Sequence, residues 1–257
     1  MIDIYTIIRI PKSGSTSLEN SISNSLSPTR MFKIPMLNNP DMHVSQYEKF
    51  RTDKKMRRSL WKIFRVLSEE AMWDKIRSEM SAGDIISGHI EYGRPHLNQV
   101  NMKYITIIRN PLDRFISEYK WIRHGYQKRR MIQKLAHFGR PAAAGKSMDY
   151  YLDFLIDHED AYKNPTTRYV TGDASHTDPH KHLVTNYWHY GILEKTDVFA
   201  KGFTEKTGLP FELEYTNLSP TPSKIALTTV QTDKFERLHT TDLALYHKLS
   251  ENLAVSA

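Results

Sequence analysis

The stretch from Ile4 to Ile22 constrains the fold of this chain more than any other. Residues 4–8 are Ile-Tyr-Thr-Ile-Ile, an apolar and β-branched run that predicts a buried strand. Pro11 ends the run because it has no N–H to donate to a sheet. A loop with one lysine, one glycine and four hydroxyl side chains follows, and residues 18–22 predict the start of a helix. Strand, loop and helix in this order are typical of an anion-binding turn.

The loop, residues 12–17, carries the groups that bind phosphate. Free N–H groups at a helix start point toward a ligand, and the helix dipole adds about half a positive charge there. Gly14 lets the backbone approach the ligand, and Lys12 supplies a mobile cation. The Walker A pattern G-x-x-x-x-G-K-[ST] is absent. Serine and threonine side chains that merely cap the helix fit the same residues, so both interpretations stay open. The candidate binding residues are Lys12, Ser13, Gly14, Ser15, Thr16 and Ser17.

A second stretch has the same organisation. Residues 103–108 predict another short buried strand, and Arg109 follows at its carboxyl end, where open α/β sheets place ligand groups. Pro111 suits the first turn of a helix, and Ser117 lies two helical turns beyond Arg109. The planar fork of an arginine suits a phosphate monoester. Two such sites in one chain indicate a ligand with two separated anionic groups.

In these two stretches the sequence resembles the PAPS-dependent sulfotransferases. The first resembles their 5′-phosphosulfate loop and the second their 3′-phosphate site. The sequence is similar to the carbohydrate branch, which includes the heparan sulfate and uronyl 2-O-sulfotransferases. Four further segments resemble that branch, namely the Gly-His segment 87–93, the Asn-x-x-x-Arg-(aromatic)-x-x-Gly segment 164–172, residues 190–195, and residues 242–246 in the terminal helix.

A strand over residues 84–88 is predicted to deliver His89, whose pKa near neutrality suits a base for an attacking hydroxyl. The resemblance implies that His89 is the catalytic base. Glu91 is the rival candidate because other sulfotransferase branches use a carboxylate. Two residues apart on a strand, the two side chains are expected to face the same way.

The resemblance also implies a fold, a co-substrate and an acceptor. We expect one α/β P-loop-like domain over residues 1–257, with a central, mostly parallel sheet flanked by helices. PAPS is the expected co-substrate and adenosine 3′,5′-bisphosphate the product, and the acceptor is a hydroxyl, expected to belong to a glycan sugar. Lys12 is expected to stabilise the leaving group, Arg109 and Ser117 to hold the 3′-phosphate, and Lys224 to belong to a late basic loop over the nucleotide. This chemistry needs no metal.

The composition of the chain indicates which kinds of ligand and partner to expect. The 257 residues carry a net charge of +7, which favours anionic ligands such as a nucleotide or an acidic glycan. No RRM, helix-turn-helix or zinc-finger pattern indicates a nucleic-acid partner. The chain has no cysteine, no signal peptide and no apolar run long enough to span a bilayer. We therefore expect a cytoplasmic protein or a truncated form of an anchored one, of unknown oligomeric state.

Several other segments carry expectations. Residues 23–48 predict a long excursion near the acceptor cleft, and 137–147 a mobile loop. The basic run 49–58 predicts the solvated face of a helix, with contact to an anionic glycan as the alternative. Three histidines and two aspartates at 173–182 have irregular spacing, so a metal site is not expected there. Residues 233–253 predict a terminal amphipathic helix.

Two other functions compete with sulfuryl transfer. A nucleotide-dependent kinase of the P-loop class needs ATP, Mg²⁺ and a Walker-type lysine, and the missing Walker pattern counts against it. A non-catalytic protein that binds an anionic ligand on the same fold is the second alternative. The combination of Lys12, His89 and Arg109 disfavours it.

Overall fold

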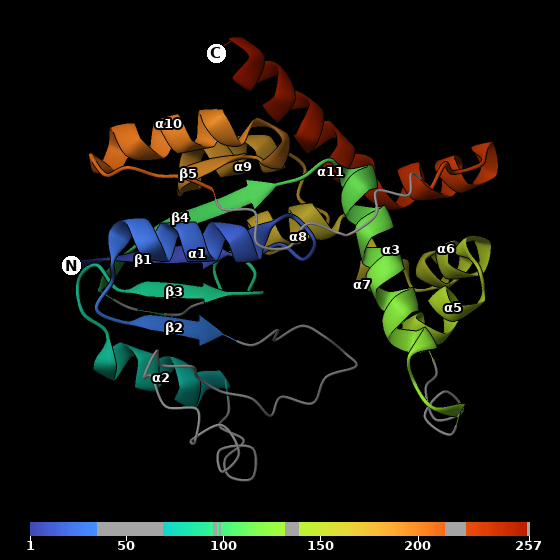
Figure 1. Ribbon diagram of the computed structural model, residues 1–257, viewed down its shortest axis with the longest axis horizontal. Helices are drawn as coiled ribbons and strands as arrows, with labels where there is room; N and C mark the ends of the chain where they lie inside the picture. The colour runs from blue at the N-terminus through green and yellow to red at the C-terminus, as the bar shows by residue number, and fades with distance from the viewer. Residues whose placement is uncertain (35–68, 95–96, 98, 132–138, 214–224, 256–257) are drawn as a thin grey trace.

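The described part of the computed structural model contains a parallel sheet of five strands (Figure 1). The structure describes residues 1–34, 69–94, 97, 99–131, 139–213 and 225–255. The strands are β1 (Ile2–Ile8), β2 (Met31–Ile34), β3 (Ile85–Gly88), β4 (Val100–Ile108) and β5 (Tyr187–Ile192). Their order is β2-β3-β1-β4-β5, and every neighbouring pair is parallel. All five carboxyl ends therefore lie at one edge.

Side chains alternate between the two faces of the sheet, and both faces are buried. In β1, Ile4 and Ile8 belong to the core on one face, whereas Ile7 belongs to the core on the other. The same alternation divides Ile85 from Ile86 in β3. A strand covered on both sides has apolar residues in succession, which explains the continuous apolar runs of the sequence.

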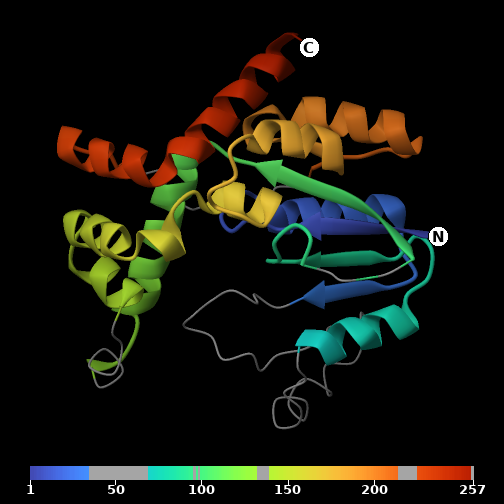
Figure 2. The same ribbon diagram turned by 180° about the vertical axis from the view of Figure 1, so that it is seen from behind.

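Helices cover each face (Figures 1 and 2). One face packs against α1 (Ser15–Leu26) and α10 (Thr196–Thr207). The other packs against α2 (Glu69–Glu79), α8 (Pro165–Thr171), α9 (Pro179–Asn186) and the second half of α11 (Thr229–Val255). The predicted α/β fold, with a central parallel sheet flanked by helices, is confirmed. None of the described helices is long and apolar enough to cross a bilayer.

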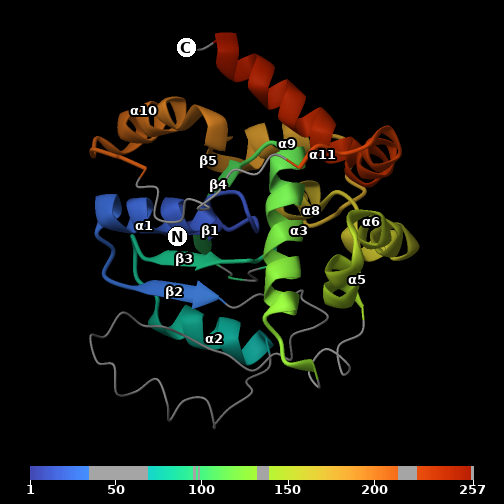
Figure 3. The same cartoon turned by 45° about the vertical axis from the view of Figure 1, so that its right-hand side comes forward.

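A third core lies beyond the carboxyl edge of the sheet. Here α3 (Pro111–Gln127) packs against α5 (Arg140–Lys146), α6 (Met148–Asp157) and the first half of α11. Figure 3 shows α3 running across the ends of the strands. The short helix α7 (Glu159–Tyr162) follows α6, and the 3₁₀ helix η2 (Leu193–Lys195) follows β5. The edge of the sheet thus faces α3, the helix that begins just after Arg109.

Two loop predictions are wrong. The excursion expected over 23–48 contains the end of α1 and strand β2, a four-residue edge strand too short for sequence periodicity to reveal. The loop expected over 137–147 contains helix α5, because Ala143 and Ala144 are buried and Gly145 lies against the Tyr126 ring. Residues 35–48, the basic run 49–58 and residues 132–138 lie outside the described residues.

The terminal helix α11 is kinked at His239, whose φ of −125° is non-helical. Asn164 causes the break by inserting into the helix ladder. Its side-chain Oδ1 accepts from the backbone N–H groups of Thr241 (3.0 Å) and Asp242 (3.4 Å). The backbone N–H of Asn164 donates to the Leu238 carbonyl at 2.8 Å. A polar side chain inserted in this way is a known cause of helix kinks.

Candidate functional site

The loop between β1 and α1 has the backbone of an anion cradle. Lys12 and Gly14 both adopt left-handed conformations, with φ of 67° and 74°. At this φ any side chain on Gly14 would be strained, and its Cβ would lie 2.7 Å from Leu193 Cδ1 and displace that methyl group. Gly14 is also the N-cap of α1, and no described side chain caps this helix. The side-chain capping alternative is therefore wrong, because the start of α1 has no side-chain cap among the described residues.

The hydroxyl groups of the loop differ in their surroundings. The Ser13 hydroxyl is buried and donates to the Ile10 carbonyl at 2.7 Å, so this side chain shapes the loop. Ser15 and Ser17 are buried, and Thr16 Oγ1 accepts a hydrogen bond from Arg9 Nη2 at 2.9 Å. The backbone N–H of Ser13 donates to the same Ile10 carbonyl at 3.4 Å, so both donors of this residue hold the loop itself.

The two predicted anion-binding stretches meet in space. Arg109 lies at the carboxyl end of β4, beside β1 in the sheet, and its Nη1 donates to the backbone carbonyl of Lys12 at 3.2 Å. The Lys12 side chain extends toward α3, where its Nζ lies 5.7 Å from the centre of the Trp121 ring. Ser117 is half-buried one helical turn before Trp121, on the same side of α3. The structure therefore brings Lys12 and Arg109 together, and it places Ser117 one helical turn from the ring that Lys12 approaches.

The charge of Lys12 is affected by these neighbours. Burial lowers the pKa of its ammonium group, and the nearby Arg109 cation lowers it further, while Glu118 opposes the change. Two cations close together without an anion between them repel each other. An anionic ligand placed there is stabilised by both.

His89 follows the last residue of β3, which is tightly packed. A Cβ on Gly88 would lie 2.7 Å from the Ile34 carbonyl oxygen, so this strand end requires glycine. The Nδ1 of His89 lies 2.5 Å from the carbonyl oxygen of Arg9. A carbonyl can only accept, so Nδ1 carries the proton and Nε2 keeps a lone pair. Burial, and then the Arg9 charge, lower the pKa of His89 to about 4. Its imidazole is neutral at pH 7 and able to accept a proton.

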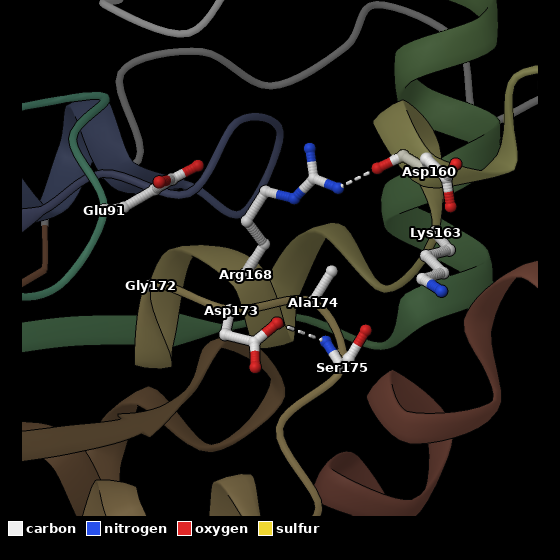
Figure 4. A pocket seen from close by; sticks show the side chains of 8 residues that line it. All are labelled: Glu91, Asp160, Lys163, Arg168, Gly172, Asp173, Ala174 and Ser175. Atoms are coloured by element: carbon white, nitrogen blue, oxygen red, sulfur yellow. Dashed lines mark hydrogen bonds between the residues drawn. The ribbon is translucent and has the colours of Figure 1, made fainter.

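Glu91 has different surroundings. Its predicted position on the same strand as His89 does not hold, because β3 ends at Gly88. The Glu91 carboxylate lies 3.9 Å from Arg94 and lines an open, polar cavity of about 410 Å³ (Figure 4). The other lining residues are Asp160, Lys163, Arg168, Gly172, Asp173, Ala174 and Ser175.

The Asn164–Gly172 segment has a structural function that sequence comparison alone did not reveal. The Asp242 carboxylate accepts from the N–H groups of Thr166 (2.9 Å) and Thr167 (2.7 Å), at the start of α8. Arg168 donates to the backbone carbonyls of Ala161 and Asp160, beside the cavity. These bonds join α8 to α7 and α11, and so fix one wall of the cavity.

Sequence reasoning missed an ion-pair cluster beside the phosphate loop. Glu19 in α1 is 2% exposed and contacts Arg9 (2.8 Å), Lys33 (2.5 Å) and the Ser87 hydroxyl (2.6 Å). Burial alone would raise the pKa of this carboxyl, but Arg9, Lys33 and Ser87 lower it. The available signal was a carboxylate next to Leu18 and near Ile22, on the apolar face of a predicted helix.

Two remaining expectations concern other parts of the chain. Lys224 lies outside the described residues. In the 173–182 cluster, the His176 ring accepts from the Asp178 N–H at 3.1 Å, and the His180 ring lies 2.9 Å from Asn252. Within the described ranges, no three His, Cys, Asp or Glu side chains gather closely enough to hold a metal ion.

A parallel α/β sheet, with a phosphate-type loop after the first strand and an arginine beside it at the end of another, defines the class as P-loop-like. Within this class the family model described as the sulfotransferase family matches residues 6–241. The chain belongs to the sulfotransferase family and is therefore a transferase of the sulfuryl group. The match includes Lys12, His89 and Arg109. A comparison with curated proteins finds no match.

Proposed function

We propose that the chain transfers a sulfuryl group from PAPS to a hydroxyl of a glycan sugar. The observation that carries the proposal is the contact between Arg109 and the Lys12 carbonyl, which joins two cationic strand ends at one edge of the sheet. PAPS has a phosphosulfate at its 5′ position and a phosphate at its 3′ position. A loop of backbone donors for the first group, next to an arginine fork for the second, suits such a ligand.

In the proposed reaction, the acceptor oxygen attacks the sulfur in line and the bond from sulfur to the 5′-phosphate oxygen breaks. Adenosine 3′,5′-bisphosphate leaves with the bonding electron pair. Lys12 and backbone N–H groups within residues 14–17 stabilise the charge that grows on the leaving oxygen. One preorganised donor of this kind contributes about 10²–10³ in rate. Arg109 and Ser117 hold the 3′-phosphate and select PAPS over ATP.

His89 accepts the proton of the acceptor hydroxyl in this mechanism. Its Nδ1 donates to the Arg9 carbonyl, so Nε2 is the basic nitrogen, and the Arg9 residue that orients it adjoins the phosphate loop. Glu91 is the alternative base. It belongs to the polar cavity, and we infer that it helps to bind the acceptor there.

The proposal of a sugar acceptor rests on the chemistry of that cavity and on the net charge of +7. Carboxylate, ammonium and hydroxyl side chains line it, and Glu91, Lys163 and Ser175 supply one of each (Figure 4). Groups of this kind hydrogen-bond to sugar hydroxyls. A sugar acceptor also agrees with the resemblance of the sequence to the carbohydrate branch of the family.

Calorimetric titration with adenosine 3′,5′-bisphosphate tests the nucleotide part of the proposal. We expect tight binding that is weakened at least about tenfold when 5′-AMP replaces it, because a lost charge-assisted contact costs about 1.5–3 kcal/mol. A preference for ATP with Mg²⁺ would favour a kinase instead. Tight bisphosphate binding without transfer of ³⁵S-sulfate from PAPS to any of a panel of glycans would favour a non-catalytic binding protein.

A further inference from the structure

We propose that Glu19 is a positioning residue that, through Arg9, holds the phosphate loop and His89 in a fixed relation to each other. The inference deepens the proposed function and rests on it. It concerns how the phosphate loop next to Arg9 and the imidazole of His89, which follows 80 positions later in the sequence, keep a fixed position relative to each other.

Glu19 binds residues from three strand regions at once. It lies in the second turn of α1, the helix that begins with the phosphate loop. Its Oε2 accepts from Arg9 Nη1 at 2.8 Å, beyond the end of β1, and from the Ser87 hydroxyl at 2.6 Å in β3. Its Oε1 accepts from Lys33 in β2 at 2.5 Å. The carboxylate therefore anchors α1 against the carboxyl edge of the sheet.

Arg9 extends this anchor in two directions. Its Nη2 donates to Thr16 Oγ1 at 2.9 Å, in the phosphate loop. Its backbone carbonyl accepts from His89 Nδ1 at 2.5 Å. One residue thus holds the loop with its side chain and orients the imidazole with its main chain.

The Arg9 guanidinium depends on these bonds. Its Nε is buried and has no hydrogen-bond partner among the described residues, so Nη1 and Nη2 hold the group in place. Removing the charge of a buried partner leaves the other charge uncompensated, which costs far more than an exposed pair. Without the Glu19 carboxylate, Arg9 must move to find water or another anion. That movement displaces both Thr16 and the carbonyl that orients His89.

The test compares Glu19→Gln with Lys33→Met, which removes a different partner of the same carboxylate. The ion pair of Lys33 with Glu19 involves neither the phosphate loop nor His89, and the Lys33 side chain is 41% exposed. Two quantities are measured at pH 7. Calorimetry gives the Kd for adenosine 3′,5′-bisphosphate, and the ¹⁵N chemical shifts of the His89 ring report which nitrogen carries the proton. Thermal unfolding verifies that each variant is folded.

We expect Glu19→Gln to weaken bisphosphate binding about tenfold and to convert His89 from the Nδ1–H tautomer to a mixture. Lys33→Met is expected to change Kd by less than about twofold and to keep the Nδ1–H tautomer. A merely structural role for Glu19 would lower thermal stability without changing the tautomer. The inference is overturned if the wild-type chain binds the bisphosphate and Glu19→Gln leaves both Kd and tautomer unchanged, an outcome that leaves the proposed function intact.

A wild-type chain that does not bind the bisphosphate overturns the proposed function and the inference with it. If Glu19→Gln does not fold, Arg9→Lys takes its place. Lysine keeps the charge but lacks the planar fork that reaches Glu19 and Thr16 from two separate nitrogens. The expected changes in Kd and tautomer are the same, and their absence overturns the inference.

Discussion

The Nη1 of Arg109 donates a hydrogen bond to the backbone carbonyl of Lys12 at 3.2 Å, across 97 positions of the chain. The contact forms because β1 and β4 are parallel neighbours, so both residues leave the sheet at the same edge. It places a guanidinium beside the loop and lowers the pKa of Lys12 in addition to the effect of burial. An anion bound next to Lys12 and Arg109 would therefore offset the positive charges of both side chains.

Arg109→Ala is predicted to weaken binding of adenosine 3′,5′-bisphosphate by about 10–100-fold, the value of a charge-assisted contact to phosphate. The affinity for 5′-AMP is expected to fall much less, because that ligand lacks the 3′-phosphate. Calorimetry with both ligands measures the difference. Arg77→Ala on the exposed face of α2 is the matched control and is expected to change neither affinity. Equal losses for the two ligands would show that Arg109 acts only through the loop.

His89→Ala is predicted to lower kcat about 10²–10⁴-fold while leaving the Kd for the bisphosphate within about threefold. The loss falls on kcat because the imidazole acts on the acceptor proton and not on the nucleotide. Transfer of ³⁵S-sulfate from PAPS to a responsive glycan measures kcat. Glu91→Gln is the comparison variant, and we expect it to raise KM for the acceptor. The opposite pattern, with kcat lost in Glu91→Gln and kept in His89→Ala, would make Glu91 the base.

The pH dependence of kcat/KM follows from the pKa of His89 in the free enzyme. Burial and the Arg9 charge lower this pKa to about 4, so the imidazole is neutral and basic at any pH well above 4. Activity is therefore predicted to stay level as the pH falls from 7 to 5, and to decline only near pH 4. Steady-state rates at low PAPS and acceptor concentrations measure the profile. A decline centred near pH 6.5 would mean that the base titrates as an exposed histidine.

The phosphate loop and the Arg109 strand end were predictable because both are local. An apolar run, a breaker and a helix start within twenty residues determine the turn, and the carboxyl ends of parallel strands always share an edge. The Glu19 cluster was not predictable in the same way. Glu19, Lys33 and Ser87 come from three elements and Arg9 from the segment after β1, and only the packed sheet shows that their side chains meet.

Two other features show where sequence patterns fail. Helix α5 was predicted as a loop because Gly139, Pro141 and Gly145 break helices locally, yet Ala143 and Ala144 pack in the core with α3 and α6. Tertiary packing overrides local propensity in such a segment. The kink of α11 at His239 depends on the insertion of Asn164, 75 positions away, so no property of residues 233–253 indicates it.

A further prediction concerns Glu118, which lies next to Ser117 in α3. Its Oε1 accepts from Arg140 at 2.7 Å and its Oε2 from Arg114 at 3.1 Å, and the Arg114 side chain is 2% exposed. Burial alone would raise the pKa of Glu118, but Arg140 and Arg114 lower it to about 2. The carboxylate therefore ties α3, the helix that presents Ser117, to α5.

Glu118→Gln is predicted to destabilise the protein by roughly 3–5 kcal/mol at pH 7, because it leaves the buried Arg114 guanidinium and the partly exposed Arg140 guanidinium uncompensated. For a chain of this size that corresponds to a fall in Tm of about 10 °C. Asp113→Asn, on the exposed side of the same helix, is the control and is expected to change Tm by less than about 2 °C. Calorimetric unfolding measures both variants.

The lowered pKa of Glu118 also predicts how the Tm difference between wild type and Glu118→Gln changes with pH. Because the folded state holds this carboxyl ionised down to about pH 2, its contribution to stability is complete above pH 4.5, the ordinary pKa, and is lost as the pH falls toward 2. The Tm difference between wild type and Glu118→Gln should therefore be constant from pH 7 to about 5 and shrink below that. A difference that persists unchanged at pH 3 would mean that the glutamine is destabilising through its shape, and that Glu118 does not hold α3 by its charge.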